Sequence, residues 1–214
     1  MNEGQQKPYI VITGDIIASR KEQAESRLNR IPELLEEFNV RFAPLSGFTL
    51  SAGDEIQGLI DPRTGPFNLL LELTSILYPL RVKFGIGFGG LSTEIKPNIG
   101  EMRGAAFEYA RTALESLPAN NRVLYRIGSS DNNQQQTTNT ILMLLSRIVD
   151  AWDDRVFRRH RMYKEEGNAQ RVAEKEGVST EAINKHLNAY SIRETIETLA
   201  FLDKMIIDIS THQG

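Results

Sequence analysis

The sequence predicts an α+β protein in which a sheet-and-helix domain is followed by an all-α domain. Over residues 1–128, short β-branched runs alternate with segments whose apolar residues recur at helical spacing. Residues 129–139 include no apolar side chain, and all apolar periodicity after them is helical. The expected order β-α-β-β-α-β-α-β in the first part is that of a ferredoxin-like core with one added helix and strand.

Local signals mark the strands and helices of the first part. The run Tyr9–Thr13 is apolar and ends in Gly14-Asp15, which is typical of a buried strand followed by a turn. Pro66 suits the first turn of a helix, because proline has a fixed φ and no N–H to leave unpaired. We expect strands over 9–13, 48–51, 56–60, 81–88 and 122–127, and helices over about 21–43, 66–77 and 103–117.

Gly85, Gly87, Gly89 and Gly90 lie within and after the strand expected over 81–88. They are weak evidence for a dinucleotide site, because no helix begins directly behind them. They are more typical of a strand whose backbone passes close to a helix, a ligand or a hairpin.

The second part is expected to contain two short helices joined by a turn. Gly177 ends the first, since glycine adopts the left-handed C-terminal turn without strain, and Ser179 can cap the second. This spacing is typical of a helix-turn-helix. We therefore divide the chain into a sheet domain over 1–128, an exposed polar linker over 129–139, and a helical domain over 140–214 that ends in an amphipathic helix.

Composition and charge exclude several classes of protein. The chain of 214 residues has no cysteine, which excludes disulfides, thiolate catalysis and cysteine-bound metal. No apolar run approaches the roughly 18 residues that span a bilayer, and no signal-peptide pattern opens the sequence. The net charge of −3 excludes a polybasic nucleic-acid coat. We expect a cytoplasmic protein with no membrane association, whose metal, if any, is held by carboxylates.

Two acidic residues are placed to meet at one edge of the predicted sheet. Asp15 follows the first strand, and Asp54 lies on the hairpin between the next two. Paired carboxylates there suit Mg²⁺ or Mn²⁺, and the following helix N-terminus suits a triphosphate. The simpler alternative is that both Gly-Asp pairs only form turns. The candidate nucleotide-binding residues on these segments are Gly14, Ile16, Ser19, Arg20 and Gly53.

The second helix of the expected helix-turn-helix has polar residues suited to DNA. Asparagine can pair with adenine, and lysine with guanine or phosphate, while nearby arginines can hold phosphates and fix the register. Protein docking and a purely structural role are the alternatives. The candidate DNA-binding residues are Arg155, Arg158, Arg159, Arg171, Ser179, Thr180, Asn184, Lys185 and His186.

The segments ITGDIIASR, SAGDEIQGLI, RVKFGIGFGGLSTEI and GAAFEYARTALE, followed by the helix-turn-helix, resemble the SatD family of bacterial proteins. The first part also resembles the class III nucleotide cyclase and GGDEF-type catalytic domains, which have a palm-like ferredoxin core. That resemblance implies that Asp15 and Asp54 bind metal, with Glu55 as the adjacent acid, and that Arg111 contacts the nucleotide. If Arg111 is the cyclase arginine, Phe107 occupies the place of the cyclase asparagine. If Ala110 instead aligns with the small residue of the motif, Glu108 and Thr112 occupy the two places, so neither register reproduces the pair. The C-terminal part resembles sigma-like and LuxR-like DNA-binding regions.

These observations lead to one main expectation and two alternatives. We expect a cytoplasmic regulator that binds a nucleoside triphosphate or cyclic nucleotide through Mg²⁺ or Mn²⁺, and DNA through the helix-turn-helix. The first alternative is an active nucleotidyl-transfer enzyme whose C-terminal helices serve docking or dimerisation. The second is a palm domain that serves only as a scaffold. Cyclase-type sites often form between two subunits, so a homodimer suits the regulator and the enzyme equally.

Overall fold

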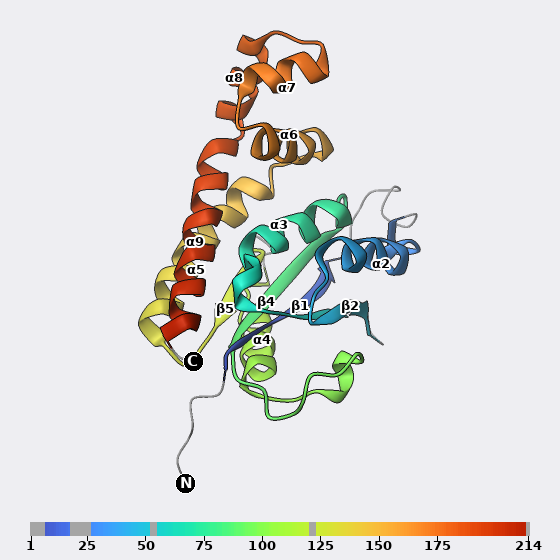
Figure 1. Ribbon diagram of the computed structural model, residues 1–214, viewed down its shortest axis with the longest axis vertical. Helices are drawn as coiled ribbons and strands as arrows, with labels where there is room; N and C mark the ends of the chain where they lie inside the picture. The colour runs from blue at the N-terminus through green and yellow to red at the C-terminus, as the bar shows by residue number, and fades with distance from the viewer. Residues whose placement is uncertain (1–6, 18–26, 52–54, 120–122, 213–214) are drawn as a thin grey trace.

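The computed structural model describes residues 7–17, 27–51, 55–119 and 123–212. A five-stranded mixed sheet forms its centre, in the order β2-β3-β1-β4-β5 (Figure 1). β1 is antiparallel to β3 and β4, β2 is antiparallel to β3, and β5 is parallel to β4. The strands are β1 (Tyr9–Ile17), β2 (Ser46–Leu50), β3 (Glu55–Ile60), β4 (Arg81–Gly89) and β5 (Tyr125–Gly128).

Helices cover both faces of the sheet, so successive side chains of the central strand enter two different cores. Ile10 and Ile12 of β1 belong to the larger hydrophobic cluster, together with the inner faces of α2 and α3. Val11 belongs to the smaller cluster beneath α4. This alternation confirms the predicted α+β class. The elements are α2 (Ile31–Phe42), α3 (Pro66–Leu77) and α4 (Ala105–Glu115), with short 3-10 turns η1 (Pro62–Thr64) and η2 (Ile99–Glu101).

Gly85 and Gly87 allow helix α4 to lie directly on β4. A Cβ atom added at Gly87 would stand 1.8 Å from the carbonyl oxygen of Ala106, and one added at Gly85 would stand 2.1 Å from that of Ala110. Because these are backbone atoms of the helix, any side chain here would push α4 away from the sheet. The sequence allowed a helix, a ligand or a hairpin as the close neighbour of this strand. In the structure that neighbour is helix α4.

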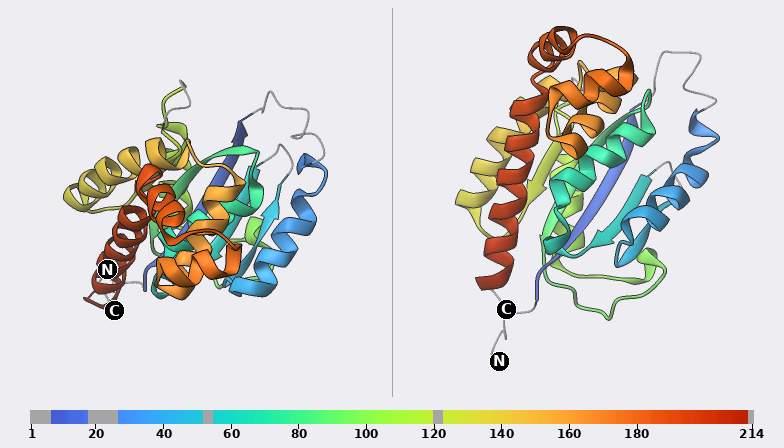
Figure 2. Two further views of the ribbon diagram at one scale, coloured as in Figure 1. Left: turned by 90° about the horizontal axis from the view of Figure 1, so that it is seen from above. Right: turned by 45° about the horizontal axis from the view of Figure 1, so that its top comes forward.

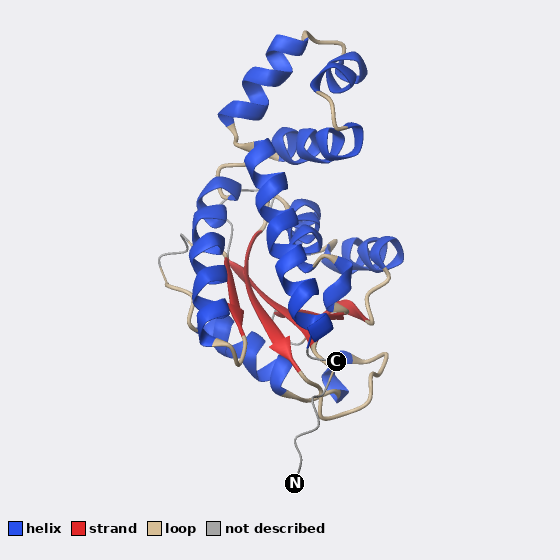
Figure 3. Cartoon of the chain, turned by 60° about the vertical axis from the view of Figure 1, so that its left-hand side comes forward, coloured by secondary structure: helices blue, strands red, loops and turns tan. Residues whose placement is uncertain are grey.

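Helices α6, α7 and α8 form a group at one end of the molecule, which we call the α6–α8 unit (Figures 1 and 3). Gly177, at φ +67°, follows α7, and Ser179 Oγ accepts a hydrogen bond from the N–H of Ala182 in α8. The predicted turn between two short helices is confirmed. The last helix, α9, returns from this unit along the sheet part (Figure 2). The bounds are α6 (Asp154–Glu166), α7 (Ala169–Glu176), α8 (Thr180–Ala189) and α9 (Ile192–His212).

The prediction of an exposed linker over 129–139 is wrong, because helix α5 (Asn132–Val149) begins inside that segment. The side chain of Asp131 caps α5 by accepting hydrogen bonds from two N–H groups of its first turn. Thr138 is buried, and one hydrophobic cluster continues from the sheet through α5 to α9. The helices over 140–214 therefore pack on the sheet part instead of following a free linker.

Asparagine side chains from two helices cover the two edges of the sheet. At the β5 edge, Asn139 of α5 accepts a hydrogen bond from the N–H of Ile127 at 2.8 Å and donates to its carbonyl oxygen at 2.9 Å. At the β2 edge, Asn39 of α2 bonds the N–H and carbonyl of Phe48 at 2.7 and 2.9 Å. Each carboxamide imitates a strand neighbour, so these edge groups are satisfied. The polar character of the α5 N-terminal half thus has a structural cause.

Asp203 of α9 joins the C-terminal helices to the sheet part. Its carboxylate accepts a hydrogen bond from the N–H of Phe67 at 2.7 Å and one from the side chain of Asn68 at 2.6 Å, at the start of α3. Lys164 of α6 donates to the same Asn68 side chain at 2.6 Å. Burial raises the pKa of Asp203, and the hydrogen bonds from Asn68 and Phe67 oppose that rise in part.

No helix in the ranges described above is long and apolar enough to cross a membrane.

Candidate functional site

Asp15 and Glu55 occupy directly opposed positions on neighbouring strands. Asp15 of β1 pairs with Glu55 of β3 in the register, and on its other side it lies opposite Lys83 of β4. Directly opposed residues of antiparallel strands have Cβ atoms about 4.5–5.5 Å apart on one face of the sheet. The expectation that Asp15 follows the first strand in a turn is wrong, because β1 continues to Ile17 and holds Asp15 opposite Glu55, the first residue of β3.

Lys83 lies directly opposite Asp15, but neither it nor any other described cation forms a salt bridge with the two carboxylates. Neither carboxylate takes part in a hydrogen bond or ion pair within the described ranges, and Asp15 is exposed. Lys83 donates instead to the carbonyl oxygen of Pro118 at 3.1 Å. Like charges opposed on a sheet repel each other, and oxygen ligands of this kind suit a hard divalent cation. No group of three His, Cys, Asp or Glu residues suited to a metal is found among the described residues.

The remaining predicted nucleotide residues divide into two sets. Part of the predicted site lies outside the described residues, namely Ser19, Arg20, Gly53 and Asp54. The described part has packing roles. A Cβ atom at Gly14 would stand 2.6 Å from the ring of Phe84, and Ile16 packs against the larger hydrophobic cluster. These contacts explain why glycine and isoleucine occur here without a ligand.

Arg111 lies on the outer face of α4. Its side chain is 79% exposed, and its Nε donates to Glu115 Oε1 at 3.1 Å, an i,i+4 pair on the helix surface. The opposite face of α4, with Ala106 and Ala110, lies on the sheet. Phe107 packs beside this smaller cluster. The structure therefore gives Arg111 a partner on its own helix and does not show it joining the acidic pair.

Arg159 is buried inside the α6–α8 unit, which differs from the expectation that it faces DNA. Its guanidinium forms three hydrogen bonds to the carboxylate of Glu176, including Nη2 to Oε2 at 2.6 Å. The bond to Arg159 lowers the pKa of Glu176, although partial burial opposes this. A bidentate pair of this kind fixes the angle between α6 and α7. Arg159 therefore positions the unit and is not available to bind a phosphate.

Two residues expected to contact DNA have partners within the protein. Ser179 uses its hydroxyl as the cap of α8, beside a half-buried Thr180. Asn184 accepts a hydrogen bond from Arg193 at the start of α9, and Arg193 also donates to the hydroxyl of Tyr163 in α6 at 3.1 Å. Arg193 thus connects α6, α8 and α9. Sequence analysis did not identify it, because one arginine in the first turn of an amphipathic helix gives no signal.

Arg155, Arg158 and Lys185 carry exposed charges on the α6–α8 unit. No hydrogen bond or salt bridge holds these three side chains within the part of the chain that the structure describes. Arg171 of α7 is also exposed and stands 4.0 Å from Glu166. Cations without a close acidic partner remain free to interact with an external anion.

His186 of α8 lies close to the charged face of α6. Its ring centroid is 4.7 Å from that of Tyr190, and the side chain is half-buried. Burial lowers the pKa of His186, and the charge of Arg159 lowers it further, whereas the carboxylates of Asp153 and Glu176 oppose this. The imidazole of α8 therefore lies among charges of both signs from α6 and α7.

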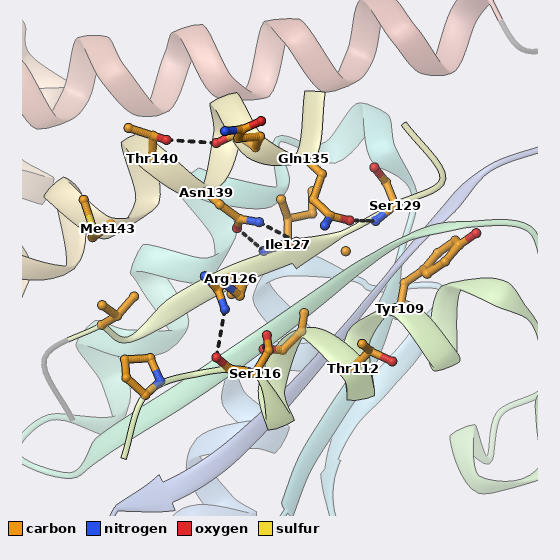
Figure 4. A pocket seen from close by; sticks show the side chains of 15 residues that line it. Tyr109, Thr112, Ser116, Arg126, Ile127, Ser129, Gln135, Asn139, Thr140 and Met143 are labelled. Atoms are coloured by element: carbon orange, nitrogen blue, oxygen red, sulfur yellow. Dashed lines mark hydrogen bonds between the residues drawn. The ribbon is translucent and has the colours of Figure 1, made fainter. Parts of the chain in front are cut away.

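A groove of about 870 Å³ runs between α4, β5 and α5 (Figure 4). Asn139 and Gln135 extend from α5 toward β5, where Gln135 accepts a hydrogen bond from the N–H of Ser129 at 2.9 Å. Arg126 crosses the groove wall to donate to the carbonyl oxygen of Ser116 at 2.8 Å. These polar groups serve the protein's own backbone, and none of the predicted site residues lines the groove. We therefore assign it no catalytic role.

Comparison with models of protein families identifies the family of this chain. The family model described as the SatD family matches residues 9–201, which is most of the chain and includes both the acidic pair and the α6–α8 unit. No curated protein matches the sequence.

Proposed function

The chain belongs to the SatD family, and from this premise we propose that it is a DNA-binding regulator whose sheet part binds a nucleotide. In this proposal α7 and α8 form a helix-turn-helix, and α8 enters the major groove. The sheet part is a ferredoxin-like, cyclase-like palm that holds a nucleotide through Mg²⁺ or Mn²⁺. Asp15, Asp54 and Glu55 are the proposed metal ligands.

The observation that carries the DNA-binding proposal is the set of unpaired cations beside α8. Arg155 and Arg158 lie one turn apart on α6, and Lys185 is exposed on α8 itself. All three side chains are exposed and take part in no hydrogen bond or salt bridge among the described residues. Arginines next to a recognition helix bind phosphates and set its register on the duplex. Lys185, which keeps its ammonium group free, is then the residue best placed on α8 to contact a base edge.

The sheet topology supports the ferredoxin-like assignment. The elements β1, α2, β2, β3, α3 and β4 follow the split βαβ order, with β3 between β1 and β2. Helices α2 and α3 both contribute to the larger hydrophobic cluster, so they cover the same face. Helix α4 and strand β5 are the additions.

The opposed pair Asp15 and Glu55 supports a metal–nucleotide site at the hairpin end of β1. A divalent ion held by these carboxylates would bind phosphate oxygens of a nucleotide. The geometry favours binding over nucleotidyl transfer, because Arg111 is directed to solvent beside Glu115. Without a cation next to the phosphates, a phosphoryl transition state loses a large part of its stabilisation.

DNA binding is tested by fluorescence anisotropy with the full chain and labelled duplex DNA of random sequence at low salt. The triple variant Arg155→Ala/Arg158→Ala/Lys185→Ala should bind at least about tenfold more weakly, because it loses three phosphate or base contacts. Arg147→Ala, an exposed arginine of α5, is the matched control and should bind like the wild type. Absence of binding by the wild type, or equal binding by the triple variant, contradicts the proposal.

The metal–nucleotide site is tested by thermal unfolding with each nucleoside triphosphate and Mn²⁺. A ligand at about 100 times its Kd stabilises by roughly 2.7 kcal/mol, which raises the Tm of a chain of this size by about 5–10 °C. We expect this shift in the wild type and in Glu36→Gln, an exposed acid of α2. The same measurement in EDTA is subtracted, so that only the Mn²⁺-dependent part of the shift is compared, and we expect none in Asp15→Asn/Asp54→Asn. A Mn²⁺-dependent shift of equal size in that double variant, or none with any nucleotide in the wild type, contradicts the proposed site.

A further inference from the structure

A cavity of about 360 Å³ lies where α2, α3 and α6 meet. Figure 1 shows α6 above α3, with α2 beside it. The cavity is therefore formed jointly by the sheet part and by the first helix of the α6–α8 unit. Its size suits a small organic ligand. The side chains that matter for recognition are Arg41, Phe42, Glu72, Arg161 and Lys164.

Glu72 lines this cavity with a buried carboxylate that lacks a donor. The residue is only 7% exposed, and its Oε2 receives no hydrogen bond from any described residue. Arg41 Nη1 is 3.9 Å from this oxygen, which is too far for a hydrogen bond. Buried carboxylates are normally hydrogen-bonded, because removing their oxygens from water is costly. Glu72 therefore keeps one buried oxygen, Oε2, that is ion-paired with Arg41 but receives no hydrogen bond from the described residues.

The other walls of the cavity carry three cations, one further acid, Glu165, and polar and apolar side chains. Arg161 and Lys164, three residues apart on α6, bring two positive charges to the opening, and Arg41 adds a third. Lys164 is held in place because its Nζ donates to the side chain of Asn68 at 2.6 Å. Phe42 provides an aromatic wall, with the Arg41 guanidinium 4.9 Å from its ring centre. The cavity thus combines an acceptor, a flat apolar surface and a site for an anion.

We propose that this cavity binds a guanine nucleotide, with the base edge at Glu72 and the phosphate at Arg161 and Lys164. An ionised carboxylate only accepts hydrogen bonds, so it selects a ligand edge that presents donors. Guanine presents two adjacent donors, N1–H and the N2 amino group, whereas adenine and cytosine place an acceptor beside their single amino group. Arginine and lysine bind phosphate oxygens by charge-assisted hydrogen bonds.

This site is separate from the proposed metal site at Asp15. It needs no divalent cation, because Arg161 and Lys164 supply the positive charge. It also connects α3 with α6, and α6 is joined to α7 by the Arg159–Glu176 ion pair. A ligand here therefore contacts the sheet part and the α6–α8 unit at once.

The proposal is tested by isothermal titration calorimetry of the full chain with GMP and GDP in the presence of EDTA. AMP and inorganic phosphate serve as comparison ligands. We expect GMP or GDP to bind at least tenfold more tightly than AMP, and phosphate to bind more weakly than either. Glu72→Gln should lower the affinity for the guanine nucleotide at least tenfold and remove the preference over AMP. Arg161→Gln and Lys164→Gln should weaken the binding of the guanine nucleotides and of AMP alike. The control Arg147→Gln should leave these affinities unchanged.

Three results overturn the proposal. The first is no binding of GMP or GDP by the wild type in EDTA. The second is equal affinity for GMP, AMP and phosphate, which would mean a general anion patch. The third is an unchanged preference for guanine in Glu72→Gln, with folding checked by circular dichroism. Because EDTA excludes the metal site, and the Asp15→Asn/Asp54→Asn variant keeps the cavity, either site can fail without affecting the test of the other.

Discussion

His160 provides a direct test of the packing within the α6–α8 unit. Its side chain is 2% exposed, its ring centroid is 5.4 Å from that of Trp152, and its Nε2 has no hydrogen-bond partner among the described residues. Burial lowers the pKa of His160 to about 4, and the positive charges of Lys164 and Arg161 lower it further in the same direction. We replace His160 by Leu or by Gln, because neither of these side chains titrates.

The magnitude follows from the difference between the pKa of about 4 in the folded state and the ordinary value of 6.5. The unfolded chain binds a proton more readily than the folded chain, so acid favours unfolding. The contribution of neutral His160 is fully present above pH 6.5 and is lost as the pH falls toward 4. At pH 5 this loss is about 2 kcal/mol relative to pH 7.5.

The assay is urea unfolding of the wild type, His160→Leu and His160→Gln at pH 7.5 and pH 5. Other titrating groups affect all three proteins alike, so the difference in the free energy of unfolding isolates His160. That difference should shift by about 2 kcal/mol in favour of both variants at pH 5. A difference that changes by less than about 0.5 kcal/mol between the two pH values refutes the reasoning. It would show that the imidazole is hydrated or protonated in the folded state.

Three substitutions test other contacts of the fold. Gly87→Ala should lower the free energy of unfolding by about 3 kcal/mol or more, measured in urea, because its Cβ would overlap the backbone of α4. Asn139→Ala should cost about 1–2 kcal/mol and increase light scattering during refolding, because it leaves both backbone groups of Ile127 unpaired at the sheet edge. Asp203→Ala should cost about 2–3 kcal/mol by calorimetry, since the buried N–H of Phe67 loses its acceptor.

Local signals in the sequence were sufficient for most elements of the fold. Pro66 begins α3, Gly177 follows α7 and Ser179 caps α8, as predicted, because each of these effects depends on residues within one turn. The linker over 129–139 was predicted wrongly for the opposite reason. The polar side chains of that segment form hydrogen bonds with the edge of β5, as Asn139 does, and no local pattern identifies a partner strand.

The candidate sites likewise depend on contacts between segments that are distant in sequence, which local patterns do not identify. The sequence predicted that Asp15 meets Asp54, which lies outside the described residues, whereas the strand register places Glu55, named only as the adjacent acid, opposite Asp15. The ion pair of Arg159 with Glu176 could not be anticipated, because an arginine within a basic stretch looks the same whether it is buried or exposed. Glu72 was also missed. It lies among the apolar residues of α3, and its burial depends on helix α6, which is distant in sequence.

The central claim, that the α6–α8 unit binds DNA, is tested most directly by the salt dependence of affinity. The observed association constant of the full chain with duplex DNA is measured over a range of salt concentrations. For the wild type, its logarithm should fall linearly with the logarithm of salt concentration. In Arg155→Ala/Arg158→Ala/Lys185→Ala the slope should be smaller by about 1.8, since the two arginines each lose a phosphate contact that contributes about 0.9, whereas Lys185 contacts a base edge. A wild-type affinity that does not depend on salt, or an unchanged slope in the triple variant, would contradict the account.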